Sequence, residues 1–182
     1  MIDANPLPAD AESALQQWID NPEVAAFLKA KNWKEAFAHY PYLEISQPPA
    51  FTPFKKPLSE ATIAVITSGG LYVQGEQEPF RAEDVYGDPS IRLFSIDTPY
   101  ARFGLAHEHY DHTIPLQDMR TINPTAHLKT LREERFIGDL FAQQISFSGY
   151  IPDWRRVRDH LIPTVLAQLQ GQPIDAVLLV PV

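Results

Sequence analysis

The sequence predicts an α/β fold in which a mainly parallel, Rossmann-like sheet is flanked by helices, with a two-helix arm ahead of it. Two short runs of apolar and β-branched residues, at 62–67 and 174–182, are typical of strands that a parallel sheet buries on both faces. Before the second run, apolar residues recur at the spacing of an amphipathic helix. Parallel strands are connected by crossover segments, which are usually helices, so this order is typical of a parallel sheet.

Size and composition indicate a globular protein without a membrane or nucleic-acid partner. The chain has 182 residues, of which 45% are hydrophobic and 21% charged. No stretch approaches the roughly 20 apolar residues of a membrane span, and the N-terminus does not resemble a signal peptide. We therefore expect a cytoplasmic protein. The net charge of -8 argues against nucleic acid, because phosphate binding needs a basic face.

Cysteine is absent from the sequence. The 182 residues therefore provide no disulfide, no zinc-thiolate site and no thiol nucleophile.

Residues 1–57 are predicted to form a helical arm and a proline-rich tether. Asp10 and the pair Asn21-Pro22 are typical helix starts, which places two helices between residues 10 and 40. Five prolines between Tyr40 and Pro57 exclude a helix or a central strand there.

Residues 58–182 are predicted to form the α/β domain. Its strands are expected at residues 62–67, 92–96, 143–148 and 175–181. Helices are expected at residues 124–134 and 153–170, and Pro163 should kink the second of them.

The turn after the first strand is a candidate ligand site. Ser68, Gly69 and Gly70 follow the strand directly, and glycines let backbone amides approach a ligand at the carboxyl edge of an α/β sheet. Without a longer glycine or phosphate-loop motif, an ordinary turn is the alternative.

Three of the six histidines, His107, His109 and His112, fall within six residues. In an extended backbone, His107, His109 and Asp111 would share a face and could serve a metal, a proton relay or an anion. The alternative is a polar loop whose imidazoles bond to backbone carbonyls.

The same residues satisfy the H-x-H-x-D-H pattern of the metallo-β-lactamase superfamily. That resemblance implies a metal at His107, His109 and His112 and a hydrolase. The residues before His107 make a poor strand, however, and the remaining downstream histidines lie in predicted helices.

A second resemblance covers the chain from about residue 53 onward. Seven pieces carry it, in one order: I-A-V-I-T-S-G-G at 63–70; E-P-F at 78–80 with G-D-P-S-I-R at 87–92; H-x-H-Y-D at 107–111; Asp118 and Asn123; L-K-T-L-R-E-E-R-F-I-G at 128–138; S-F-S-G-Y at 146–150; and D-A-V-L-L-V-P at 175–181. These pieces resemble the selenoprotein B family of glycine, sarcosine, betaine and D-proline reductases.

The resemblance implies an enzyme that cleaves a carbon-nitrogen bond of a small amino acid or N-methylated amine. In that family a selenolate attacks carbon, thiols restore the site, and a pyruvoyl-containing partner subunit takes part. His107, His109 and Asp111 would be catalytic. Substrate binding would fall to a wider set: Ser68, Gly69, Gly70, Arg102, Asp118 and Asn123.

The residues themselves identify no cofactor with certainty. In the family the redox residue, a selenocysteine or cysteine, follows the strand equivalent to residues 175–182, so we expect a selenocysteine just after Val182 in a longer natural chain. As written, the sequence lacks this nucleophile. The alternative is a non-catalytic module that binds a small anion or a metal. An unfinished sheet with an apolar edge also favours a homo-oligomer.

Overall fold

The structure, a computed structural model, describes residues 10–43 and 51–182. Its contacts divide the chain into two compact units, with the boundary between Pro53 and Phe54. Within the described ranges, no helix has both the length and the apolar character needed to cross a lipid bilayer.

The first unit contains three short helices rather than the two that the sequence predicts. They are α1 (Ala11–Asp20), α2 (Pro22–Lys29) and α3 (Trp33–Phe37). The side chain of Asn21 caps α2 as expected, by accepting a hydrogen bond from the Glu23 amide. Lys31 has a φ of 56°, which no helix accommodates, so the expected second helix is broken into α2 and α3.

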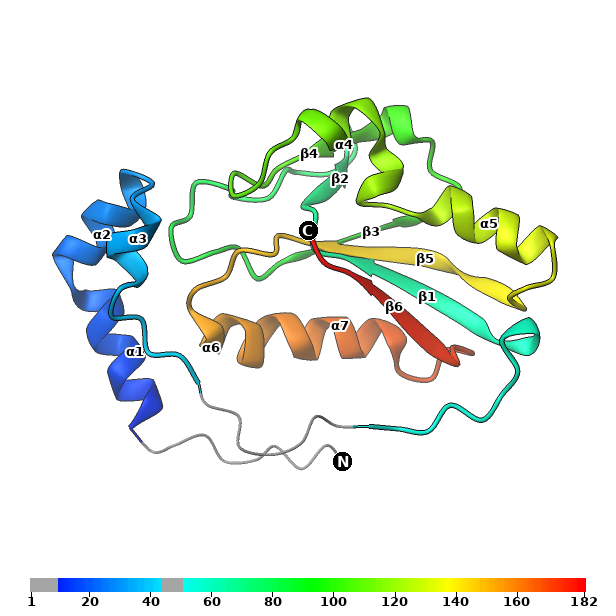
Figure 1. Cartoon of the computed structure of the whole chain (residues 1–182), viewed down its shortest axis with the longest axis horizontal. Helices are drawn as coiled ribbons and strands as arrows, with labels where there is room; N and C mark the ends of the chain where they lie inside the picture. Colours follow the sequence, from blue (N-terminus) through cyan, green and yellow to red (C-terminus); the bar gives the residue numbers. More distant parts are fainter. Residues whose placement is uncertain (1–9, 44–50) are drawn as a thin grey trace. The chain divides into compact units, whose positions relative to one another are not determined.

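A four-stranded sheet forms the centre of the second unit (Figure 1). Its strands, in spatial order, are β3 (Ile91–Ser95), β5 (Asp139–Phe147), β1 (Thr62–Thr67) and β6 (Ala176–Val180). β1 pairs in parallel with both β5 and β6, whereas β3 is antiparallel to β5. The predicted mainly parallel α/β fold is therefore confirmed.

A second, two-stranded sheet was not predicted. β2 (Leu71–Val73) and β4 (Phe103–Leu105) pair antiparallel, each with only three residues, too few for a periodic signal in the sequence. The sheet packs on the main one through aromatic contact, because the rings of Phe94 and Phe103 lie 4.6 Å apart.

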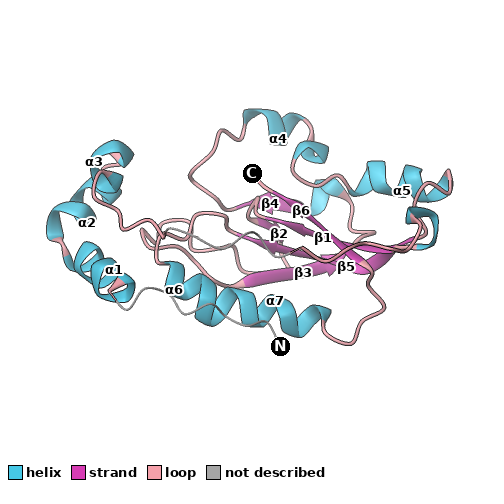
Figure 2. Ribbon diagram, turned by 60° about the horizontal axis from the view of Figure 1, so that its bottom comes forward, coloured by secondary structure: helices cyan, strands magenta, loops and turns pink. Residues whose placement is uncertain are grey.

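Helices lie on both faces of the main sheet (Figure 2). On one face lies α5 (Thr125–Glu133), whose Leu128 is buried in a core cluster with Val65 and Leu140. The other face carries a continuous helical stretch: α6 (Trp154–Arg156), the π-helical segment η4 (Val157–Leu161) and α7 (Ile162–Leu169). The shorter elements are α4 (Thr113–Gln117) and the 3-10 turns η1 (Leu58–Glu60), η2 (Tyr100–Arg102) and η3 (Met119–Thr121).

A π-helical segment, Val157–Leu161, lies just before Pro163, whereas the kink expected at Pro163 stays a prediction. Proline has no N–H to donate to the preceding turn, so the regular α-helical hydrogen bonding is interrupted there.

The expectation that the last strand is buried on both faces is wrong. Among residues 10–43 and 51–182, β6 pairs only with β1, and it forms one edge of the main sheet. Val180 packs against the core, but the Leu179 side chain is 66% exposed. The sequence alone could not distinguish these cases, since both faces of the strand carry apolar residues.

Candidate functional site

The turn after β1 joins the carboxyl ends of the three parallel strands. The Ser68 amide donates to the Val180 carbonyl at the end of β6, at 3.1 Å. The Gly70 amide donates to the Phe147 carbonyl at the end of β5, at 3.0 Å. Ligands bind at this edge in open α/β sheets. Ser68, Gly69 and Gly70 thus lie where the sequence predicts a site.

The segment from Ala106 to His112, here called the histidine loop, is attached to the same turn. The Ala106 amide donates to the Gly70 carbonyl at 3.0 Å, and the Tyr110 hydroxyl donates to the Gly69 carbonyl at 2.9 Å. Gly70 has a φ of +67°, and a Cβ there would lie 2.7 Å from the Ala106 carbonyl oxygen. The glycine therefore allows the backbone of Ala106 to approach closely, whereas the sequence predicts that a ligand approaches there.

The histidine loop is not an extended strand, so its side chains do not alternate between two faces. The Nδ1 atom of His107 accepts a hydrogen bond from the His109 amide at 3.2 Å. His112 donates from Nε2 to the His107 carbonyl, because a carbonyl can only accept. The Asp111 carboxylate accepts hydrogen bonds from the amide and the hydroxyl of Thr113, the first residue of α4, and not from an imidazole.

Burial sets the electrostatics of the loop. His107 is only 4% exposed, and this burial, followed by the charges of His109 and His112, lowers the pKa of His107 to about 4. Burial also raises the pKa of Tyr110 to about 12. At neutral pH both side chains are uncharged. Hydrogen bonds from Thr113 hold the pKa of the exposed Asp111 carboxyl below its ordinary value.

Tyr150 holds the outer side of the histidine loop. Its ring stacks on His109, with ring centroids 3.5 Å apart and planes 7° from parallel. Its hydroxyl donates to the Val85 carbonyl at 3.2 Å. The histidine loop is therefore in contact with segments that follow both β1 and β5.

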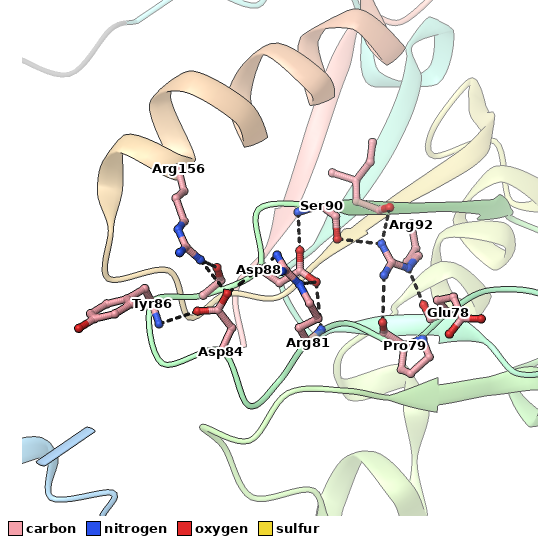
Figure 3. Close-up of polar contacts among 11 residues, drawn as sticks. Glu78, Pro79, Arg81, Asp84, Tyr86, Asp88, Ser90, Arg92 and Arg156 are labelled. Carbon is pink, nitrogen blue, oxygen red and sulfur yellow. Dashed lines mark hydrogen bonds and ion pairs between the residues drawn. The ribbon is translucent and has the colours of Figure 1, made fainter. Parts of the chain in front are cut away.

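The segment between β2 and β3, residues 74–90, is held by a network of charged side chains (Figure 3). Arg156 of α6 donates to the Asp84 carboxylate at 2.9 Å and to the Gly87 carbonyl. Gly87 has a φ of +86°, and a Cβ there would lie 2.4 Å from the Tyr150 carbonyl oxygen. The segment thus packs directly against the residue that stacks on His109.

Asp88 of this segment and Arg92 of β3 are structural. The buried carboxylate of Asp88 accepts hydrogen bonds from the amides of Arg81 and Ser90. Arg92 donates to the carbonyls of Glu78 and Pro79 (Figure 3). These contacts give a structural role to the motif pieces at 78–80 and 87–92.

The remaining predicted substrate-binding residues, Arg102, Asp118 and Asn123, lie outside both the histidine loop and the turn that holds Ser68. Arg102 pairs with Glu76 at 2.7 Å, with both side chains largely exposed. Asp118 pairs with Arg120 at 2.7 Å and caps η3. Asn123 is fully buried, accepts from Thr125, and lines a separate cavity of about 190 Å³ beneath the start of α5. Substrate binding by these three residues remains a prediction.

An apolar cavity of about 380 Å³ adjoins the Ser68 turn. Its walls include Phe147, Gly149 and Leu179, with Ser68 as the polar contributor. A volume of this order accommodates a small organic ligand. The cavity lies beside the strand ends.

The geometry offers no support for a metal at the histidine loop. In the two described ranges, no group of three or more His, Cys, Asp or Glu side chains could hold a metal ion. His107 Nδ1 and His112 Nε2 are both engaged with backbone groups, which a metal would have to displace.

Comparison with known proteins finds similarity to a reductase subunit. The chain is 29% identical over 138 residues to D-proline reductase subunit gamma of Acetoanaerobium sticklandii. The chain is related to a reductase subunit. The alignment spans 76% of this chain and 55% of the relative, so the chain covers only about half of that protein's length. No protein-family model matches the sequence, and no solved structure matches it.

Sequence reasoning overlooked Tyr110 and Tyr150 as parts of the site. Tyr150 could have been found, because it closes the S-F-S-G-Y piece directly after a strand, where parallel sheets present ligand-contacting residues. Nothing in the sequence shows that the ring of Tyr150 meets His109 across 41 residues of chain.

Proposed function

We propose that this protein acts in a reductase that cleaves the carbon-nitrogen bond of a small amino acid or N-methylated amine. The observation that carries the proposal is the similarity to D-proline reductase subunit gamma over 138 residues. The site geometry supports it, because the turn that holds Ser68 lies at the carboxyl edge of the sheet, bonds to the histidine loop through Gly70, and lines an apolar cavity through Ser68.

The chain's own contribution is proton transfer and substrate positioning. Cleavage of the bond leaves an amine, which needs a proton as it departs. His107 is neutral at ordinary pH, since its pKa is lowered to about 4 by burial, so it is a poor proton donor. His109 and His112 lie on the less buried parts of the loop and are the proposed donors.

The nucleophile has to come from a residue outside these 182, because they contain no cysteine. A selenocysteine or cysteine thiol would supply the nucleophile and, with external thiols, the two electrons of the reduction. The end of β6 beside Ser68 is the proposed point of delivery, because the Val182 amide donates to Ser68 Oγ at 2.9 Å.

Partner and location follow from the same proposal. A pyruvoyl-containing subunit is the proposed partner, as the resemblance implies. A cytoplasmic location fits a reaction that consumes thiols, because that compartment keeps thiols reduced.

The test is dithiol-dependent turnover by the native protein. We would purify it from the cells that make it, with any bound partner, and supply D-proline, glycine, sarcosine or betaine with a dithiol. We expect the cleaved amine, measured by mass spectrometry, to form from one of these only when the dithiol is present. Carboxylate binding without dithiol-dependent product from any of them would instead favour a binding module.

A histidine pair provides the matched control. His109→Gln is expected to slow turnover by about 10²-fold or more, which is the usual contribution of a proton donor. His160→Gln should leave the rate unchanged, because His160 is exposed on η4 outside the histidine loop. Equal rates for both variants would contradict the assignment of His109.

A further inference from the structure

His107 has one ring nitrogen engaged and the other without a partner. Its Nδ1 accepts from the His109 amide at 3.2 Å. Its Nε2 is buried and has no hydrogen-bond partner among the described residues. Native structures rarely leave a buried polar atom in this state, so the exception calls for a physical reason.

The hydrogen bond at Nδ1 determines which nitrogen carries the proton. An atom that accepts a backbone N–H must present its lone pair, so the neutral ring has its proton on Nε2. Burial keeps the ring neutral at ordinary pH, because it lowers the pKa to about 4. The unpartnered atom is therefore an uncharged N–H donor.

The surroundings hold this donor in place. A Cβ on Gly70 would lie 2.9 Å from the His107 Cβ, so the backbones are in close contact. The Tyr110 ring lies 4.8 Å from the imidazole, centroid to centroid, and His112 bonds to the His107 carbonyl. The orientation of the ring is thus set before any ligand arrives, which is the condition for a preorganised donor.

We propose that the Nε2–H group of His107 donates a hydrogen bond to a carboxylate oxygen of the substrate. The identity of the ligand, a small amino acid, rests on the proposed function. A neutral donor meets a carboxylate without exchanging a proton, and the charged acceptor strengthens the bond. His107 is then a substrate-binding residue, and proton transfer is left to its neighbours. Since Nε2 is covered by protein atoms, a neighbouring side chain moves when the ligand enters.

The first test uses the wild-type protein labelled with ¹⁵N at histidine. Long-range ¹H–¹⁵N NMR spectra should show the Nε2–H tautomer of His107 throughout the neutral pH range. Adding D-proline or betaine should shift the His107 Nε2 signal, whereas pyrrolidine, which lacks the carboxylate, should not. An Nδ1–H tautomer, or no response to any of the carboxylates, would overturn the proposal.

The second test is a pair of substitutions that keep or move the donor. His107→Gln places an amide N–H near the position of Nε2, and His107→Asn places it near Nδ1. We expect His107→Gln to bind D-proline within a few-fold of wild type, and His107→Asn to bind it about tenfold more weakly or worse. Equal weakening in two variants with native amide protection would contradict the proposal.

The outcomes also separate this inference from the proposed function. Carboxylates that bind at His107 of a protein without reductase turnover would leave the inference standing and remove the function. Turnover without any response of His107 to the substrate would support the proposed function and contradict the inference about His107. If neither variant folds, the wild-type spectra still decide.

Discussion

Gly70 joins the turn after β1 to the histidine loop. Its positive φ and the 2.7 Å approach of the Ala106 carbonyl oxygen to a Cβ placed there leave room for no other residue.

Gly70→Ala is expected to destabilise the protein and displace the histidine loop. Gly75→Ala is the matched control, because Gly75 has a φ of +76° but nothing within 4 Å of an added Cβ. The control should lose about 1–2 kcal/mol from its unfavourable φ alone. Gly70→Ala should lose about 1–3 kcal/mol more from the steric clash, as measured by denaturant unfolding. Similar losses in both variants would show that the contact with Ala106 is not tight.

At the residue scale, the sequence indicated which residue types make up the candidate site, but it did not indicate which contacts they make. The histidines and the glycines could be singled out because their residue types and spacing are unusual. The contacts of Asp111 could not be predicted, because a carboxylate that bonds to Thr113 and one that bonds to an imidazole have the same sequence. Their difference is the path of the backbone between residues 107 and 113.

At the scale of elements, the segment of residues 74–90 supports Tyr150 and, through it, the histidine loop. The buried Asp88 carboxylate of that segment accepts hydrogen bonds from two backbone N–H groups, those of Arg81 and Ser90. Burial by itself would raise the pKa of Asp88, but hydrogen bonds from Arg81 and Ser90 outweigh it and the pKa is lowered.

Asp88→Asn is expected to cost about 1–3 kcal/mol of unfolding free energy at neutral pH, because the buried group loses its charge and one of its two accepting oxygens becomes an NH2 group. The carboxyl group has a lower pKa folded than unfolded. Its contribution is therefore fully present above the unfolded pKa and is lost as pH falls through the folded value. The difference between wild type and variant should shrink as acid is added. A difference in unfolding free energy that persists below the pKa of the folded carboxyl would mean that Asp88→Asn destabilises the protein through a changed hydrogen-bond geometry and not through the loss of charge.

For the whole molecule, the open edge at β6 is the feature with the clearest consequence for assembly. The strand contains no charged residue, and Val177, Leu178 and Leu179 are all exposed. Unpaired edges of this composition are sites of association. The homo-oligomer predicted from the sequence would form here.

Leu179→Lys is accordingly expected to shift the protein toward the monomer in sedimentation velocity over a range of concentrations. The charge has to lose water if another strand pairs at the edge, which disfavours pairing. Phe136→Lys is the control, because Phe136 is similarly exposed in the turn after α5, away from the edge. A wild type that is monomeric at every concentration would make the oligomer prediction wrong.

The sequence by itself determined the α/β class, the mainly parallel sheet, the approximate positions of the strands β1, β3, β5 and β6, and the positions of the histidines and glycines. These features are local, because they depend on side-chain period, on proline and glycine geometry, and on residue type. Only the tertiary structure decided that β6 is an edge, that Gly70 meets the histidine loop, that Tyr150 stacks on His109 and that Asp111 bonds to Thr113. Each of these depends on contacts between chain segments, and neither period nor composition records which segments meet.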